Sequence, residues 1–121
     1  MQHQAAETYA RAQQATVNPR ELEASLLAKA AVRLQAAKDN WNAEESGLDA
    51  ALAFNRKLWT VFVSSVTSPD NPLPREIKQN VANLALFVFN HTLGIQAAPD
   101  PAKLNALISI NRHLAEGLRN R

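Results

Sequence analysis

Hydrophobic positions recur every three to four residues along most of this chain, which is the spacing of one buried helix face. No segment shows the strict apolar–polar alternation of a half-buried strand. The pattern therefore predicts an all-α protein. The stripe of the helix expected over residues 19–40 is Leu22, Leu26, Ala30, Leu34, Ala37 and Trp41. The stripe of the helix expected over residues 46–66 is Leu48, Leu52, Asn55, Trp59, Phe62 and Val66.

Two further helices follow, and a short one precedes the others. The fourth helix is expected to open at Pro74 and to end at Gly94, with an almost entirely apolar surface over residues 84–89. The fifth runs from Pro101 to about Leu118, on the stripe Leu104, Leu107, Asn111, Leu114 and Leu118. Residues 4–15 form the short N-terminal helix, on the stripe Ala5, Tyr9 and Ala12.

Prolines and capping residues mark where these helices begin. Asn18 can accept hydrogen bonds from free backbone N–H groups, and Pro19 suits a first helical position. Asp100-Pro101 repeats this start. Residues 68–74 contain three prolines, which fix φ and remove donors, so we expect a stiff loop there. Because the connections are short, the sequence predicts an antiparallel helical bundle of four longer helices with a short N-terminal helix, in one domain over residues 1–121.

Composition narrows the class of protein. The chain has 121 residues, 46% of them hydrophobic, and no cysteine, so neither disulfides nor thiolate zinc sites can form. It begins without the features of a signal peptide and has no apolar run of ~20 residues, so we expect a cytoplasmic protein with no membrane partner. The net charge of +2 is spread along the chain. That distribution predicts no DNA partner and argues against direct RNA binding.

The sequence offers no recognisable catalytic or metal-binding constellation. His3, His91 and His113 lie far apart and share no metal-ligand spacing. HExxH, P-loop, GxGxxG and GxSxG motifs are all missing. We therefore expect a protein that is not an enzyme and needs no cofactor.

Three core positions are candidates for a structural role. Trp59 lies on an apolar stripe, where an aromatic residue is usually buried. Asn55 and Asn111 each interrupt such a stripe, and a buried amide is costly unless it is hydrogen-bonded. Either these amides set the register of the helices, which we favour, or they bind a partner lying in a groove.

A partner groove is predicted between the fourth and fifth helices. Phe87 lies on an otherwise polar face, as a partner-binding residue would. In the alternative interpretation Phe87 packs under the fifth helix, which then simply covers the fourth. The residues expected to line the groove are Phe87, Leu107, Ile110 and Leu114, with Asn83 and Arg112 at its rim.

Taken together in order, several blocks of this chain resemble the FlaF family of flagellar biosynthesis regulators. The first is Asn18-Pro19-Arg20-Glu21-Leu22-Glu23-Ala24, and the second runs from Ala51 to Thr60. Asn71-Pro72-Leu73-Pro74 with residues 83–85 is similar to the third. Residues 108–112 with Gly117-Leu118 resemble the end of the family's pattern.

The resemblance implies a bacterial, cytoplasmic protein that promotes flagellin production and secretion after transcription. It implies flagellin as a partner, bound in the manner of a secretion chaperone, and the regulator FlbT as a second partner. A scaffold that acts only through FlbT, and a regulator that binds flagellin message, are the alternatives. A helical protein of this kind suits recognition of flagellin's amphipathic terminal helices in a groove.

Overall fold

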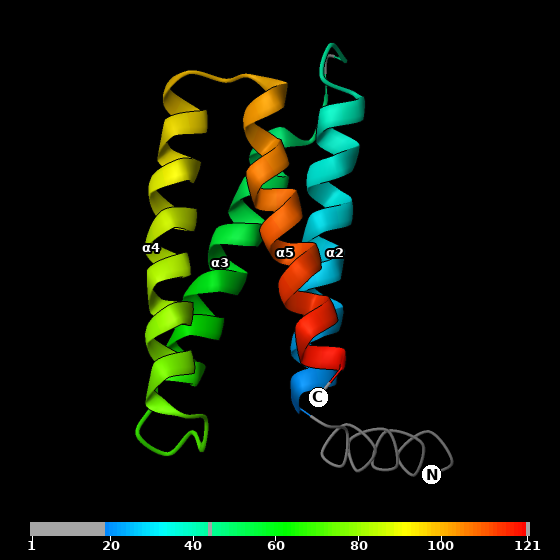
Figure 1. Ribbon diagram of the computed structural model, residues 1–121. Helices are drawn as coiled ribbons and strands as arrows, with labels where there is room; N and C mark the ends of the chain where they lie inside the picture. Colours follow the sequence, from blue (N-terminus) through cyan, green and yellow to red (C-terminus); the bar gives the residue numbers. More distant parts are fainter. Residues whose placement is uncertain (1–18, 44, 121) are drawn as a thin grey trace, which may run out of the picture.

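The computed structural model describes residues 19–43 and 45–120, and every regular element in those ranges is helical (Figure 1). The all-α prediction is therefore confirmed, while the helix predicted over residues 4–15 lies outside the described residues. The elements in chain order are α2 (Pro19–Asp39), α3 (Leu48–Thr67), α4 (Arg75–Ala97), the 3-10 turn η1 (Pro101–Lys103) and α5 (Leu104–Arg119).

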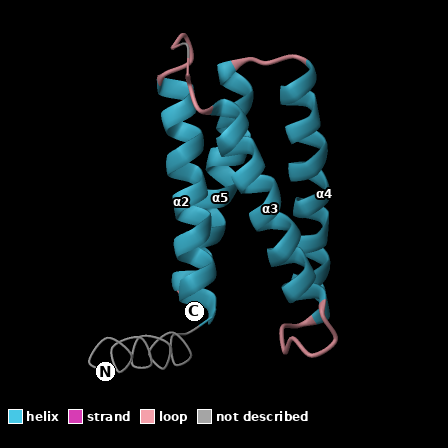
Figure 2. Ribbon diagram, turned by 180° about the vertical axis from the view of Figure 1, so that it is seen from behind, coloured by secondary structure: helices cyan, strands magenta, loops and turns pink. Residues whose placement is uncertain are grey.

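The chain reverses direction at each connection between the four long helices, and α3 is tilted relative to the other three (Figures 1 and 2). α5 packs most extensively against α2, and α3 packs against both α2 and α4. By contrast, α4 and α5 share no extensive interface. The molecule is thus a pair made of α2 and α5 joined through α3 to α4.

The predicted helix starts at Pro19 and near Asp100 are found in the structure. Pro19 is the first residue of α2, and the Asp100 carboxylate accepts a hydrogen bond from the Ala102 N–H at 2.9 Å. α3 begins at Leu48, two residues later than expected, because Gly47 adopts a left-handed conformation with φ of 78°. That conformation is readily available only to glycine and interrupts the helical path.

Two sequence-based expectations about helices were wrong. Gly94 does not end α4, which continues to Ala97. The next residue, Ile95, is fully buried, and its burial offsets the cost of about 1 kcal/mol for a glycine inside a helix. Leu22 is not on the buried face of α2 but 55% exposed. The buried positions of α2 are Ala24, Leu27, Ala30, Ala31, Leu34 and Ala37.

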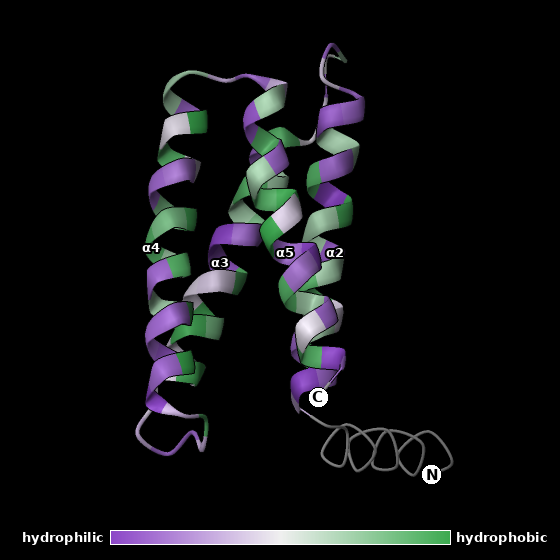
Figure 3. Cartoon of the chain, in the orientation of Figure 1, coloured by the Kyte–Doolittle hydropathy of each residue, from purple (hydrophilic) through white to green (hydrophobic). Residues whose placement is uncertain are grey.

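This alanine-rich face explains why α2 and α5 form the most extensive helix pair. Small side chains allow two helix axes to approach closely, since interaxial distance depends on the residues at the contact. Hydrophobic and polar positions alternate around each helix in Figure 3, as a helix with one buried face requires. The largest fully buried apolar side chains are Trp59, Leu27, Leu34, Leu52, Ile95, Leu104 and Leu107. Each stabilises the fold by roughly 1.5–3 kcal/mol.

Among the described residues, no helix combines the length and apolarity that crossing a membrane requires.

Candidate partner-binding cavity

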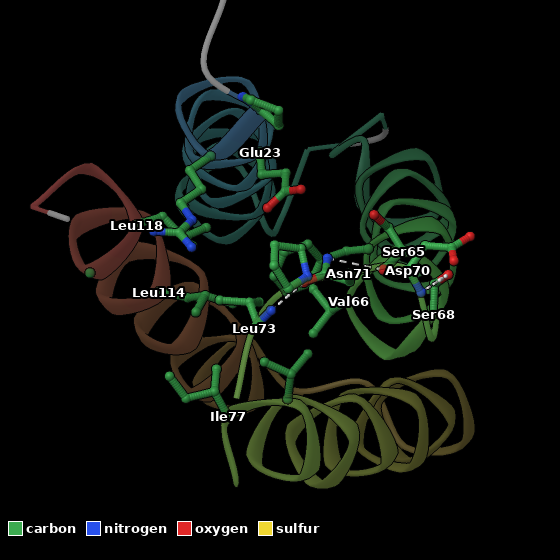
Figure 4. Close-up of a pocket in the computed structure, with 16 residues that line it drawn as sticks. Glu23, Ser65, Val66, Ser68, Asp70, Asn71, Leu73, Ile77, Leu114 and Leu118 are labelled. Carbon is green, nitrogen blue, oxygen red and sulfur yellow. Dashed lines mark hydrogen bonds between the residues drawn. The ribbon is translucent and has the colours of Figure 1, made fainter. Parts of the chain in front are cut away.

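An open cavity of about 690 Å³ lies at the end of the molecule where α2 begins and α5 ends (Figure 4). All four long helices and the loop between α3 and α4 contribute to its wall. The lining residues are Pro19, Arg20, Glu23, Phe62, Ser65, Val66, Ser68, Asp70, Asn71, Pro72, Leu73, Ile77, Val81, Leu114, Gly117 and Leu118.

The apolar part of this wall is only partly covered by the protein itself. Phe62, Val66 and Val81 are buried and belong to the core. Four side chains around them are half-buried although they pack against that core: Leu73, Ile77, Leu114 and Leu118. Gly117 adds no side chain, and a Cβ atom at this position would meet no other atom within 4 Å, so the space beside it stays open. Half-covered aliphatic side chains facing one concave space are what an apolar partner would bury.

One side of the cavity is a loop, residues 68–74, that its own hydrogen bonds hold in place. The Asn71 side-chain amide donates to the Ser65 carbonyl at 3.2 Å, and its oxygen accepts from the Leu73 N–H at 3.0 Å (Figure 4). The Lys78 ammonium donates to the Ser68 carbonyl at 2.8 Å. Together with three prolines, these bonds fix the loop and place Leu73 against the cavity. The pocket wall is thus ordered before any partner arrives.

Charged side chains line the cavity on two sides: Arg20 and Glu23 come from the first turns of α2, and Asp70 comes from the loop between α3 and α4. Glu23 lines the wall half-buried, and burial raises the pKa of its carboxyl, an effect that neighbouring Arg20 partly opposes. The carboxylate of Glu23 is drawn toward the interior in Figure 4. A further pair, Arg119 Nε with Glu21 Oε1 at 3.2 Å, joins α5 to α2 at this end but is largely exposed. An apolar partner carrying one basic group would match this arrangement.

A different arrangement, with directional hydrogen bonds, occupies the interior away from the cavity. The Trp59 indole Nε1–H donates to Asn111 Oδ1 at 2.9 Å, and Asn111 Nδ2 donates to Asn55 Oδ1 at 2.7 Å. All three side chains are fully buried. The side-chain amide nitrogen of Asn55, Nδ2, has no hydrogen-bond acceptor among the described residues. These residues face one another and not the surface. The predicted role of the two amides in setting the register of the helices stays a prediction.

The six residues predicted to form a groove between α4 and α5, four in its lining and two at its rim, do not converge on one surface. Leu107 is fully buried, while Ile110 and Leu114 are half-buried against the core. Leu114 alone among the six lines the cavity. Phe87 is 46% exposed and stacks on His91 with ring centroids 5.1 Å apart.

The two predicted rim residues lie elsewhere on the surface. Asn83 is exposed and accepts a hydrogen bond from the Gln79 side chain at 3.1 Å. Arg112 is exposed and lines a polar depression with Gln35 of α2, so it lies where α5 meets α2. The predicted groove required α5 to pack against α4, whereas α5 packs most extensively against α2. A role for any of these residues in partner binding stays a prediction.

Sequence reasoning placed several cavity residues correctly on helices without seeing that they meet. Leu114 and Leu118 both fell on the stripe of the fifth helix that was predicted to be core. Glu23 was not singled out at all. Two features of the sequence could have indicated the cavity: the proline-rich loop and Gly117 near the end of the chain. Neither places a helix side chain in the space beside it.

No group of histidine and acidic side chains able to hold a metal ion occurs within residues 19–43 and 45–120. Comparison with known proteins gives one family: a family model described as "Flagellar protein FlaF" matches residues 5–118. Neither a curated protein nor a solved structure matches the chain.

Proposed function

Since this chain belongs to the FlaF family of flagellar proteins, we propose that it is a cytoplasmic, non-enzymatic regulator that binds flagellin and supports its synthesis and secretion. The observation that carries the proposal is the open cavity, which is lined by four half-buried aliphatic side chains and two acidic residues, Glu23 and Asp70. Flagellin's terminal segments are amphipathic helices, and a helix of that kind binds by laying its apolar face into a hydrophobic groove.

The dimensions of the cavity suit a helix face better than a flat interface. Its volume of about 690 Å³ accommodates several side chains from successive helical turns. Leu73, Ile77, Leu114 and Leu118 come from three different elements, so a bound helix would be contacted from several sides at once. Affinity in such interfaces comes from a few buried apolar anchors with a polar rim. The same physics lets a chaperone shield the terminal helices of an unassembled subunit.

The proposal is tested by measuring binding of purified flagellin to variants of the full chain. We expect Leu118→Ser and Leu73→Ser each to weaken flagellin binding at least tenfold, which corresponds to about 1.4 kcal/mol. Because both side chains are only half-buried, the loss of folding stability should be smaller than that of a fully buried leucine. Thermal unfolding of each variant, measured in parallel, separates lost binding from lost fold.

Phe87→Ser is the matched control, and it also tests the alternative surface on α4. The Phe87 side chain is 46% exposed and lies outside the cavity, so this change should leave both stability and flagellin binding nearly intact. Binding lost with Phe87→Ser and kept with Leu118→Ser would move the flagellin site to the outer face of α4 and refute the cavity. Parallel titrations with FlbT, and with flagellin message at physiological salt, distinguish a scaffold or an RNA-binding regulator from a flagellin chaperone.

A further inference from the structure

The surface of α4 that faces away from the rest of the molecule carries a regular pattern. α4 lies at one edge of the molecule, and its one extensive partner among the described helices is α3 (Figure 1). Opposite its buried face, exposed residues follow one another at alternating steps of four and three positions. We call them the outer seam: Gln79, Asn83, Leu86, Asn90, Leu93 and Ala97. This is the spacing of the a and d positions of a heptad repeat, along which two helices pair.

The composition of the outer seam is that of a paired helix and not of a solvated one. Leucine occupies two of its d positions, and Leu86 and Leu93 are each 62% exposed. Asparagine occupies two of its a positions, Asn83 and Asn90. Residues 79–97 contain no Asp, Glu, Lys or Arg, and the preceding a position, Glu76, marks where charge begins. Two copies of this surface can therefore approach each other without repulsion between like charges.

We propose that α4 pairs with α4 of a second copy of this chain along the outer seam, parallel and in register, as a two-stranded coiled coil. Each seam residue then meets its own copy, so Leu86 packs against the partner's Leu86 and Asn90 hydrogen-bonds with the partner's Asn90. An asparagine at an a position specifies this register and this number of strands. An antiparallel pair would instead set Asn90 against the partner's Leu86, and a polar amide covered by an apolar side chain is costly.

The residues beside the outer seam fit the same arrangement. In a parallel pair, position g of one heptad lies beside position e of the partner's next heptad. Ala82 at g would lie beside the partner's Phe87, and half-buried Phe89 at g beside the partner's Gly94. Each of these pairs sets an aromatic ring against a small residue. A Cβ atom at Gly94 would meet no atom within 4 Å, so space for a ring is open there.

The length of the outer seam predicts a weak, reversible dimer. Residues 79–97 span about 28 Å of helix. Interfaces that bury less than about 1,200 Å² in total are typical of transient association. The cavity lies on the other side of α4, where Ile77 and Val81 line it, so pairing leaves the cavity of each copy accessible. The dimer therefore does not rest on the proposed function. It would place two partner-binding cavities at the same end of one assembly.

Analytical ultracentrifugation of the full chain, from micromolar to low millimolar concentration, tests the association itself. We expect a monomer–dimer equilibrium that Leu86→Ser combined with Leu93→Ser weakens at least tenfold. Leu22→Ser is the matched control, because Leu22 is a 55% exposed leucine on α2, away from the seam. It should leave the equilibrium unchanged. A natural chain that stays monomeric throughout would overturn the proposal and leave the outer seam to a foreign helix. Equal weakening by Leu22→Ser would also overturn it.

Disulfide trapping in the full chain tests the orientation, since the natural chain has no cysteine. In a parallel pair, Leu86→Cys meets its own copy, so a cross-linked dimer should form about tenfold faster than with Ser64→Cys, an exposed position on α3. In an antiparallel pair centred on the seam, residue 86 lies opposite residue 90. A mixture of Leu86→Cys and Asn90→Cys proteins that yields mainly the mixed dimer would overturn the parallel pairing. A Leu86→Cys rate no faster than that of Ser64→Cys would overturn the seam.

Discussion

The half of the molecule around Trp59 and the half around the cavity are built from the same four helices. They differ in how far their apolar side chains are covered and in whether hydrogen bonds join the helices. Around Trp59, α3 and α5 are joined by two buried hydrogen bonds through Asn111. Leu52 of α3 and Leu107 of α5 are fully buried. Around the cavity the corresponding aliphatic side chains, such as Leu114 and Leu118, remain half-buried. We call these the closed half and the open half.

The contrast shows how a small helical protein can separate stability from binding. Directional hydrogen bonds in the closed half allow one register of α3 against α5, because a shift of one turn would leave Trp59 Nε1 and both amides unpaired. With that register fixed, the open half can leave apolar surface uncovered without losing the arrangement of its walls. Three predictions test this division, beginning with the change that should cost most.

The largest effect is expected from Trp59→Ala. Trp59 is fully buried, donates to Asn111 and packs edge-on against Phe62 with ring centroids 5.5 Å apart. Removing its ring should lower the free energy of unfolding by about 3–5 kcal/mol. Thermal and urea unfolding measure the loss directly. Unchanged stability would show that the closed half does not depend on this side chain and would remove the basis of the comparison.

The next largest effect should distinguish the two asparagines from each other. Asn111→Ala removes the acceptor of Trp59 Nε1 and the donor to Asn55 Oδ1, so two buried groups lose their partners. Since each such group costs about 1–3 kcal/mol, we expect a loss of about 2–6 kcal/mol. Asn55→Ala leaves one group, Asn111 Nδ2, unpaired, and it deletes an amide nitrogen that had no acceptor in the described chain. Its cost should be about 1–3 kcal/mol.

Urea unfolding of both variants gives the ranking, and Asn105→Ala is the control. Asn105 is exposed on the same helix as Asn111, so the same chemical change there should alter stability by less than about 0.5 kcal/mol. If Asn55→Ala and Asn111→Ala lower the stability equally, the side-chain volume lost from the core, and not the loss of hydrogen bonds, determines the effect.

Much of the fold was predictable from the sequence because its helices carry strong local signals. Pro19 and Asp100-Pro101 mark starts that no longer-range contact has to decide, and the prolines of residues 68–74 exclude helix on their own. The errors at Leu22 and Gly94 have one cause. In each case a tertiary contact elsewhere on the helix, made by the alanine face of α2 or by Ile95, decides what the local pattern leaves open.

The candidate site was much less predictable, because it depends on which helices are neighbours. Periodicity places Leu114 on a buried face but does not say whether that face meets α2, α3 or α4. Assuming that consecutive helices pack together led to a groove between α4 and α5, whereas α5 packs on α2. The hydrogen bond between Asn111 and Asn55 could not be predicted for the same reason, because it joins residues 56 positions apart on two different helices. The sequence marked both amides as costly in a core, and only the three-dimensional arrangement shows that they pair.

The smallest predicted effect is on the open half, where Glu23 is the titrating group of interest. Burial raises the pKa of its carboxyl in the folded protein above the ordinary value of 4.5, against the opposing influence of Arg20. A carboxyl with a raised folded-state pKa binds its proton more tightly in the folded than in the unfolded chain. Its contribution to stability is therefore fully present below pH 4.5, and it is lost as the pH rises through the folded-state pKa. Above that value the folded protein holds a partly desolvated carboxylate.

Replacing Glu23 with glutamine removes this desolvated charge and keeps the shape of the side chain. At pH 7 we expect Glu23→Gln to be more stable than the natural protein, by less than about 1 kcal/mol, because solvent screens a half-exposed group. The difference should shrink as the pH is lowered toward 4.5, where the natural carboxyl is itself protonated when folded. Urea unfolding from pH 4 to 8 follows this convergence, and Glu116→Gln, on the exposed face of α5, measures the general effect of deleting one negative charge. Glu23→Gln being less stable than the natural protein at pH 7 would mean that the attraction between the carboxylate and Arg20 outweighs the cost of desolvating the carboxylate.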